Sequence, residues 1–124
     1  METIRIALMG GGTVGTALAE LLPWHQARFR ALGLEVELAK VLVRDTHKSR
    51  PGIPARLLTD HPKGFLDDVD VLVEVAGGTD VAGDIVLQAL ERGLPVVTAN
   101  KALLAERWGE LREYAEQGEL HYEA

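Results

Sequence analysis

The start of the chain restricts the fold most, because a short apolar run leads directly into a glycine motif. Residues 4–9 are mostly apolar, and Gly10-Gly11-Gly12-Thr13-Val14-Gly15 follows, which fits the pattern G-x-G-x-x-G. Apolar residues then recur with helical spacing from Val14 to Leu22. A strand, a glycine turn and a helix in this order are typical of the first unit of a dinucleotide-binding α/β domain.

The same alternation continues along the rest of the 124 residues. Runs of apolar residues predict further strands at residues 36–43, 69–75, 95–98 and 120–122. Apolar residues at every third or fourth position predict helices at residues 24–32, 82–90 and 104–115, which Gly33, Gly93 and Gly118 are expected to end. Pro23 is expected to kink or restart the first helix. Residues 46–62 are expected to form a loop with one short strand near Leu57.

Alternating strands and helices predict an α/β fold with a parallel sheet covered by helices on both faces. Right-handed crossovers then give a doubly wound, mostly parallel, Rossmann-like sheet. We expect residues 1–124 to form one dinucleotide-binding domain that ends on a strand. In such sheets ligands bind beyond the carboxyl ends of the strands.

Composition excludes several classes of protein. The formal net charge of −6 argues against a nucleic-acid partner. No apolar run approaches the roughly 18 residues of a membrane span, and the N-terminus lacks the features of a signal peptide. The chain has no cysteine, which excludes a thiolate metal site and suits a cytoplasmic protein. The histidines show no metal-ligand spacing.

Each glycine of the motif has a predicted role. Gly10 permits a tight turn, Gly12 lets the backbone approach a pyrophosphate, and Gly15 lets helix and strand pack closely. The helix that begins at Thr13 and Val14 then points its positive end at the anion. The alternative is a glycine-rich turn that binds nothing.

Arg44 follows the second predicted strand, where the adenosine ribose is expected. An acidic residue there would bind the ribose 2′-hydroxyl, whereas an arginine accommodates a 2′-phosphate. Arg44 with Lys48 and Arg50 therefore favours NADP, while the adjacent Asp45 would serve NAD. A solvated basic loop is the alternative.

Two further strand ends carry unusual residues. Gly77 and Gly78 let the backbone approach a ligand, expected to be the diphosphate or the nicotinamide ribose. Thr79 is either part of that site or the N-cap of the next helix. Glu74 lies in an apolar strand, where it either faces solvent or bonds to a neighbouring backbone group or a ligand.

The segment Thr98-Ala99-Asn100-Lys101 joins a strand to the last predicted helix. Asn100 is expected to cap that helix. Lys101 then occupies the first turn, where the helix dipole disfavours a cation. The same positive end would favour the neutral form of the amine, which proton transfer near neutral pH needs. Lys101 is therefore a candidate catalytic residue.

Together these motifs resemble those of the homoserine dehydrogenase family, in its N-terminal nucleotide-binding part. The resemblance covers nearly the whole chain. It rests on "GGGTVG", "VLVRD", "VEVAGG", the terminal "HYEA" and above all "VVTANKALLAE". The glycine motif is common to many dehydrogenases, whereas the "TANKALLA" block is more specific.

The resemblance implies an NAD(P)-dependent, reversible interconversion of aspartate semialdehyde and homoserine, on the route to threonine, methionine and isoleucine. It implies that Lys101 handles the proton during hydride transfer. The nicotinamide half would lie against Gly77, Gly78, Thr79 and Asn100. It also implies a monovalent cation site, sodium in the full-length enzyme, that begins at Glu123, and a homodimer.

The chain departs from the family pattern after Ala124. Family members continue into a dimerisation region and a substrate-binding region, which supply a second catalytic lysine and acidic substrate-binding residues. We therefore expect this chain to bind nucleotide without turnover. Two alternatives stay open: a related amino-acid or semialdehyde dehydrogenase, and a nucleotide-sensing module without catalysis.

Overall fold

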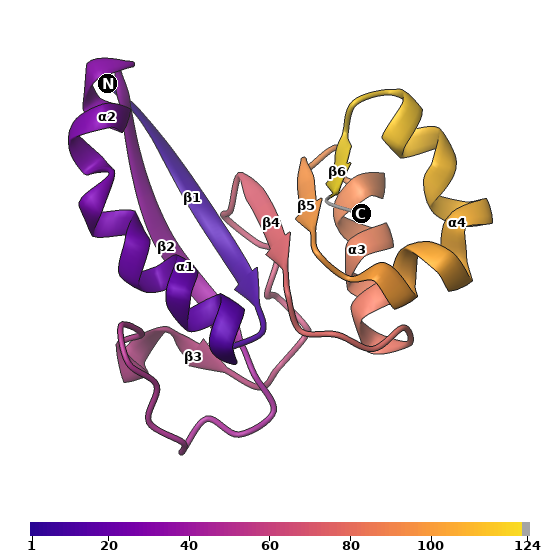
Figure 1. Ribbon diagram of the computed structural model, residues 1–124, viewed down its shortest axis with the longest axis horizontal. Coiled ribbons are helices and arrows are strands. Elements are labelled where there is room, and N and C mark those ends of the chain that lie inside the picture. Colours follow the sequence, from indigo (N-terminus) through magenta and orange to yellow (C-terminus); the bar gives the residue numbers. More distant parts are fainter. Residues whose placement is uncertain (123–124) are drawn as a thin grey trace.

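The computed structural model describes residues 1–122. Figure 1 shows strands and helices alternating along the chain. The elements are β1 (Glu2–Met9), α1 (Thr13–Trp24), α2 (Gln26–Ala31), β2 (Leu34–Leu42), the 3-10 turn η1 (Ala55–Leu57), β3 (Leu58–Thr59), β4 (Val71–Glu74), α3 (Val81–Glu91), β5 (Val96–Thr98), α4 (Lys101–Glu116) and β6 (Leu120–Tyr122).

The strands form one 6-stranded sheet in the order β3-β2-β1-β4-β5-β6. Every neighbouring pair is parallel. The chain runs from β1 outward to β3 and then crosses back to β4, on the other side of β1. The strand order therefore reverses between β1 and β4, which confirms the predicted doubly wound α/β fold and places its topological switch point there.

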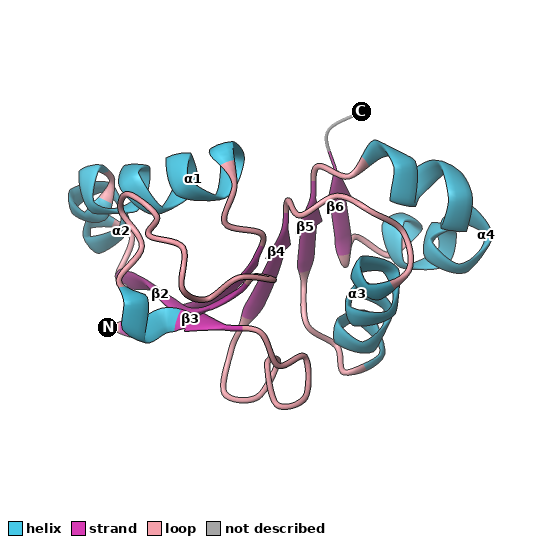
Figure 2. Cartoon of the chain, turned by 90° about the horizontal axis from the view of Figure 1, so that it is seen from below, coloured by secondary structure: helices cyan, strands magenta, loops and turns pink. Residues whose placement is uncertain are grey.

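Helices cover both faces of the sheet: α1 and α2 lie on one side, and α3 and α4 on the other (Figure 2). The larger core lies under α3 and α4 and includes the fully buried Leu72, Leu90 and Leu103. A smaller core under α1 is built around Leu8 and Val41. β1 and β4 carry residues of both cores, so these central strands hold the two layers together.

The first helix breaks later than the position of Pro23 predicts. α1 continues through Pro23 to Trp24, and the chain restarts as α2 only after His25. The side-chain amide of Gln26 donates to the carbonyl oxygens of Leu22 at 3.2 Å and Val36 at 2.9 Å. These bonds tie the last turn of α1 to β2, next to the break at His25.

The strands occupy the predicted places with different ends. β4 is shorter than residues 69–75 and begins after a bend at Asp70, whose side chain accepts from the backbone N–H of Arg5 at 2.8 Å. β2 begins two residues earlier than residue 36, at Leu34. The short strand predicted near Leu57 is confirmed as β3.

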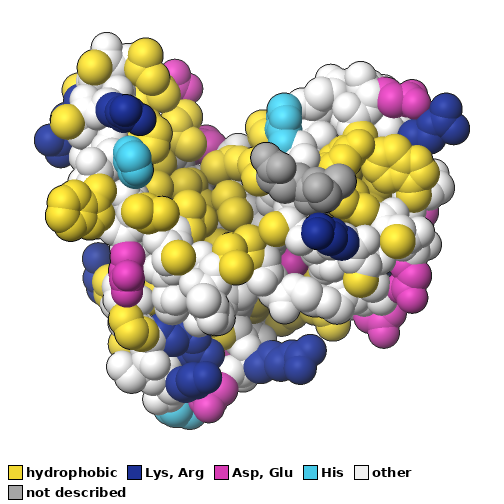
Figure 3. Space-filling model, viewed as in Figure 1, with side chains coloured by type: hydrophobic (Ala, Val, Ile, Leu, Met, Phe, Trp, Pro, Cys, Tyr) yellow, Lys and Arg dark blue, Asp and Glu magenta, His cyan; other side chains and the backbone are white. Residues whose placement is uncertain are grey.

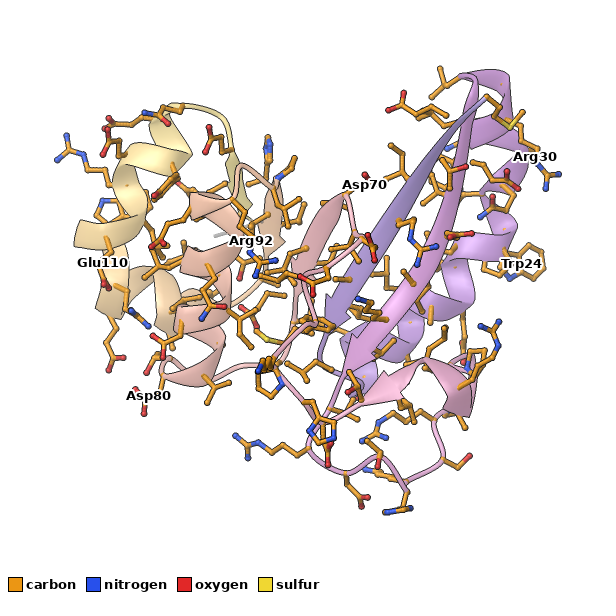
Figure 4. The ribbon with its side chains drawn as sticks, turned by 180° about the vertical axis from the view of Figure 1, so that it is seen from behind. Trp24, Arg30, Asp70, Asp80, Arg92 and Glu110 are labelled. Atoms are coloured by element: carbon orange, nitrogen blue, oxygen red, sulfur yellow. The ribbon has the colours of Figure 1, made fainter. Side chains whose placement is uncertain are left out.

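The α1 side of β5 and β6 has no helix over it within residues 1–122 (Figure 2), and the space-filling view shows apolar side chains between the two lobes of the molecule (Figure 3). Exposed apolar side chains on this side include Val14 of α1 and Val97 of β5. Tyr122 of β6 instead faces α4, where its ring packs edge-on against Trp108 with 5.8 Å between ring centroids. Trp24 projects from the end of α1 into solvent (Figure 4). None of the described helices is long and apolar enough to cross a membrane.

Candidate functional site

A groove runs along the carboxyl ends of the strands and has two chambers. The first has a volume of ≈ 810 Å³ and lies over the ends of β1, β2 and β4. The second has a volume of ≈ 330 Å³ and lies over the ends of β4 and β5. Val75, Ala76 and Gly77 line both chambers. The groove therefore crosses the switch point, where doubly wound sheets bind their ligands.

The glycine motif forms the boundary between β1 and α1. Gly10 has a φ of +111°, and a β-carbon there would lie 2.8 Å from the backbone of Ala76. A β-carbon at Gly15 would overlap the carbonyl oxygen of Gly10. Both positions therefore need glycine for close packing.

Gly12 differs from these two glycines because it faces open space. Apart from Gly12 itself and its two chain neighbours, no heavy atom lies within 4 Å of where its β-carbon would be, and Gly12 lines the first chamber. It is also the N-cap of α1 and supplies no side-chain acceptor for the first-turn N–H groups. An uncapped helix N-terminus beside an open backbone fits a phosphate group.

Cationic side chains line the far end of the first chamber. Arg44, Lys48 and Arg50 lie there with one carboxylate, Asp60. The Arg50 guanidinium donates to the carbonyl oxygens of Asp45 at 2.8 Å and Lys48 at 2.9 Å, which fixes the loop after β2. The Asp45 carboxylate accepts from the N–H of His47 in the same loop at 2.9 Å. This end of the groove is therefore positive.

Glu74, the last residue of β4, is fully buried, so the solvent-exposed alternative is wrong. Its Oε2 accepts from the backbone N–H groups of Ala76 at 2.8 Å and Gly77 at 3.3 Å. Its Oε1 accepts from the Thr98 hydroxyl at 2.8 Å. The carboxylate therefore joins the loop after β4 to the end of β5.

Asn100 continues this connection. Its Oδ1 accepts from the N–H of Leu103 at 3.0 Å, which confirms the predicted cap of α4. Its Nδ2 donates to the carbonyl oxygen of Gly78 at 2.6 Å. Asn100 thus serves both as a cap and as a tie to the second glycine loop.

Lys101 is the first residue of α4 and is exposed at the second chamber, beside Ala99 and Asn100. No ion pair involves its amine among the described residues. The exposed Val14 of α1 lines the same chamber from the opposite side. A cation therefore stands at the chamber nearest the ends of β4 and β5.

The structure brings most of the predicted site residues together. Those that line the groove are Gly10, Gly12, Val14, Arg44, Gly77, Gly78, Asn100 and Lys101. Within the described part of the chain, Thr13, Gly15 and Thr79 lie outside this lining. Thr79 is not the N-cap of α3, since that position belongs to Asp80. Its carbonyl oxygen instead accepts from Arg107 at 3.3 Å.

Some lining residues were missed by the sequence prediction. Asp60 and Pro62 follow β3, which has 2 residues and no apolar pattern of its own. Gly11 occupies a variable position of the glycine motif. The side chain of Arg50 packs against it, so a β-carbon at this position would overlap that side chain. A sequence pattern carries no signal for these contacts.

The predicted cation site cannot be described in the same way. Glu123 lies outside the described residues, so the monovalent cation stays a prediction. Among residues 1–122 no group of three or more His, Asp or Glu side chains is placed to hold a metal ion.

Comparison with known proteins identifies a matching family. Residues 10–123 match the family model described as the NAD-binding domain of homoserine dehydrogenase. The chain belongs to this homoserine dehydrogenase family. The family membership confirms the resemblance that the sequence motifs indicated.

Individual homoserine dehydrogenases show the same relationship. The Corynebacterium glutamicum enzyme is 39% identical to this chain over 128 residues, and the Bacillus subtilis enzyme is 36% identical over 130 residues. A crystal structure of the S. aureus homoserine dehydrogenase superposes with a TM-score of 0.88 at 35% identity and covers 100% of the chain.

The match covers only part of each relative. The chain corresponds to 29% of the C. glutamicum protein, 30% of the B. subtilis protein and 34% of the S. aureus structure. The shared part is the nucleotide-binding portion of a homoserine dehydrogenase.

Proposed function

We propose that residues 1–124 form the dinucleotide-binding domain of an NAD(P)-dependent homoserine dehydrogenase. The whole protein would interconvert aspartate semialdehyde and homoserine, in the synthesis of threonine, methionine and isoleucine, and would act as a homodimer. The observation that carries the proposal is the groove across the switch point, with the open backbone of Gly12 at its centre.

The two chambers would divide the dinucleotide between them. The uncapped start of α1 would hold the pyrophosphate at the centre of the groove. The adenosine half would extend over β2 toward Arg44, in the cationic first chamber. The nicotinamide half would extend the other way, over the ends of β4 and β5 into the second chamber.

The bound nicotinamide supplies the hydride donor or acceptor. Lys101 would manage the proton at its Nζ, since it stands at the second chamber. In the reducing direction the ammonium would donate to the aldehyde oxygen, and in the oxidising direction the amine would accept from the alcohol. Asn100 and Glu74 would hold the Lys101 end of α4 against the Gly78 loop.

Calorimetric titration of NAD(H) and NADP(H) into the 124-residue chain, at fixed salt, tests the proposal. We expect binding that Gly12→Val abolishes, because the new side chain would enter the open space of the groove. Gly109→Ala is the matched control, since Gly109 lies exposed on α4 with no atom within 4 Å of its β-carbon position. Failure of every dinucleotide to bind would reject the function.

The same titration tests cofactor preference. We propose that NADP(H) is preferred, because three cations line the adenosine end of the groove against one carboxylate. Arg44→Ala should weaken NADPH binding and leave NADH binding nearly unchanged, since only NADPH carries the 2′-phosphate. Equal losses for both dinucleotides would assign Arg44 a structural role instead.

A further inference from the structure

Glu74 is a buried carboxylate without a cationic partner in the described part of the chain. Its side chain is fully shielded from solvent. Its three hydrogen bonds come from neutral groups: two backbone N–H groups and the Thr98 hydroxyl. A buried carboxylate normally has a cation beside it. Because Glu74 has none among the described residues, no neighbouring cation neutralises its charge.

Glu74 accepts hydrogen bonds at both carboxylate oxygens. The Thr98 hydroxyl accepts from the N–H of Asn100 at 3.1 Å and gives its own proton to Glu74 Oε1. The N–H groups of Ala76 and Gly77 are both directed at Oε2. An ionised carboxylate only accepts, whereas a protonated one must also donate, so this arrangement suits the ionised form.

These bonds also change what the loop of Ala76, Gly77 and Gly78 can bind. Its first two N–H groups point inward to Glu74 and are not free for an anion. The glycine loop before α1 is the opposite case, because the helix start there has no side-chain acceptor. The groove is therefore positive toward Arg44, and the buried carboxylate of Glu74 lies at the ends of β4 and β5, over which the second chamber is formed.

We propose that the Glu74 carboxylate makes the second chamber favour the oxidised nicotinamide ring over the reduced one. The inference rests on the proposed function, which places the nicotinamide there. The oxidised ring carries a positive charge and the reduced ring is neutral, so only the oxidised ring is attracted to the carboxylate. Lys101 opposes this effect from an exposed position, where solvent and salt screen its charge.

Dissociation constants of NADP⁺ and NADPH for the wild-type chain and Glu74→Gln test the proposal. Glutamine has nearly the same shape and no charge. The measured quantity is the dissociation constant of NADP⁺ divided by that of NADPH. At an effective dielectric constant between that of protein and water, this ratio should rise about two- to tenfold in Glu74→Gln. Lys101→Met should move the ratio in the opposite direction.

Two control variants separate charge from structure. Glu35→Gln removes the same charge from an exposed position at the amino end of β2, and should leave the ratio unchanged. Thr98→Val removes the hydrogen bond to Glu74 and keeps the carboxylate. This substitution should weaken the binding of NADP⁺ and of NADPH by the same factor.

The outcomes distinguish the inference from the function. If the wild-type chain binds neither form, the proposed function fails. If it binds both and a folded Glu74→Gln leaves the ratio unchanged, only the inference fails. A ratio change in Thr98→Val as large as in Glu74→Gln would also overturn it, because loop position would then be the cause. Circular dichroism checks folding, and Glu74→Met provides a second neutral side chain if glutamine is not accommodated.

Discussion

Gly15 shows how a single missing side chain decides whether the first helix can approach the first strand. A β-carbon at this position would overlap the carbonyl oxygen of Gly10, which is backbone and cannot rotate away. We expect Gly15→Ala to lower the free energy of unfolding by about 1–3 kcal/mol, measured by urea denaturation. Gly109→Ala, in the open helical position, should raise it by roughly 0.5–1 kcal/mol. Equal effects at both positions would contradict the predicted overlap.

Individual residues also show which parts of the site could be predicted from the sequence. The cap formed by Asn100 was predictable, because its partner Leu103 lies 3 residues further along the chain. Glu74 was not, because its partner Thr98 lies 24 residues away and joins it only through the pairing of β4 with β5. A carboxylate in an apolar run has no local signal that tells burial from exposure.

The side chain of Arg107 forms hydrogen bonds between α4 and α3, the two helices on the larger core. Arg107 has non-helical backbone angles within α4, and its guanidinium reaches Asp84 of α3 at 3.0 Å and Glu110 at 2.7 Å. Gly83 of α3 leaves room for this crossing, since a β-carbon there would overlap the guanidinium. The sequence predicted both helices but not this contact, which depends on their packing.

This junction predicts a pH dependence. The hydrogen bonds from Arg107 lower the pKa of Glu110 below its ordinary value of 4.5. The stabilisation is therefore present above that value and is lost as pH falls through the lower pKa of the folded protein. Glu110→Gln should unfold at a lower temperature than wild type at neutral pH, and the difference should shrink in acid and in high salt, as thermal scans would show.

Glu106→Gln provides the control for this measurement. Glu106 is exposed on the same helix and forms no ion pair among the described residues. Its substitution should leave the pH profile of the unfolding temperature as in wild type. A difference between Glu110→Gln and wild type that persists in acid would show that the ion pair is not its cause.

The ends of the helices and strands depend more on contacts between residues distant in sequence than on the local pattern of apolar residues. α1 runs past Pro23 and ends beside the bond from Gln26 to a carbonyl oxygen of β2, and β4 begins after Asp70, which pairs with Arg5. The apolar periodicity did predict the order and type of the main elements, since it reflects which face each buries. The ends lie where partners distant in sequence meet.

At the scale of the whole molecule, the sheet predicts unequal local stability. β1 and β4 are hydrogen-bonded on both sides, whereas β3 and β6 are edge strands of 2 and 3 residues. Hydrogen–deuterium exchange should therefore be slowest in β1 and β4 and fastest in β3 and β6. Exchange in β6 as slow as in β1 would mean that a further contact covers this edge.

The direction of β1 in the sheet also determines which side of the domain faces solvent when it is attached to a surface. All strands are parallel, so Met1 lies at the amino ends of the strands, opposite the groove (Figure 1). The 8 residues of β1 span about 26 Å at roughly 3.3 Å per residue. A tether on the amino group of Met1 would therefore fix the domain to a sensor chip with its nucleotide groove facing the flowing solution.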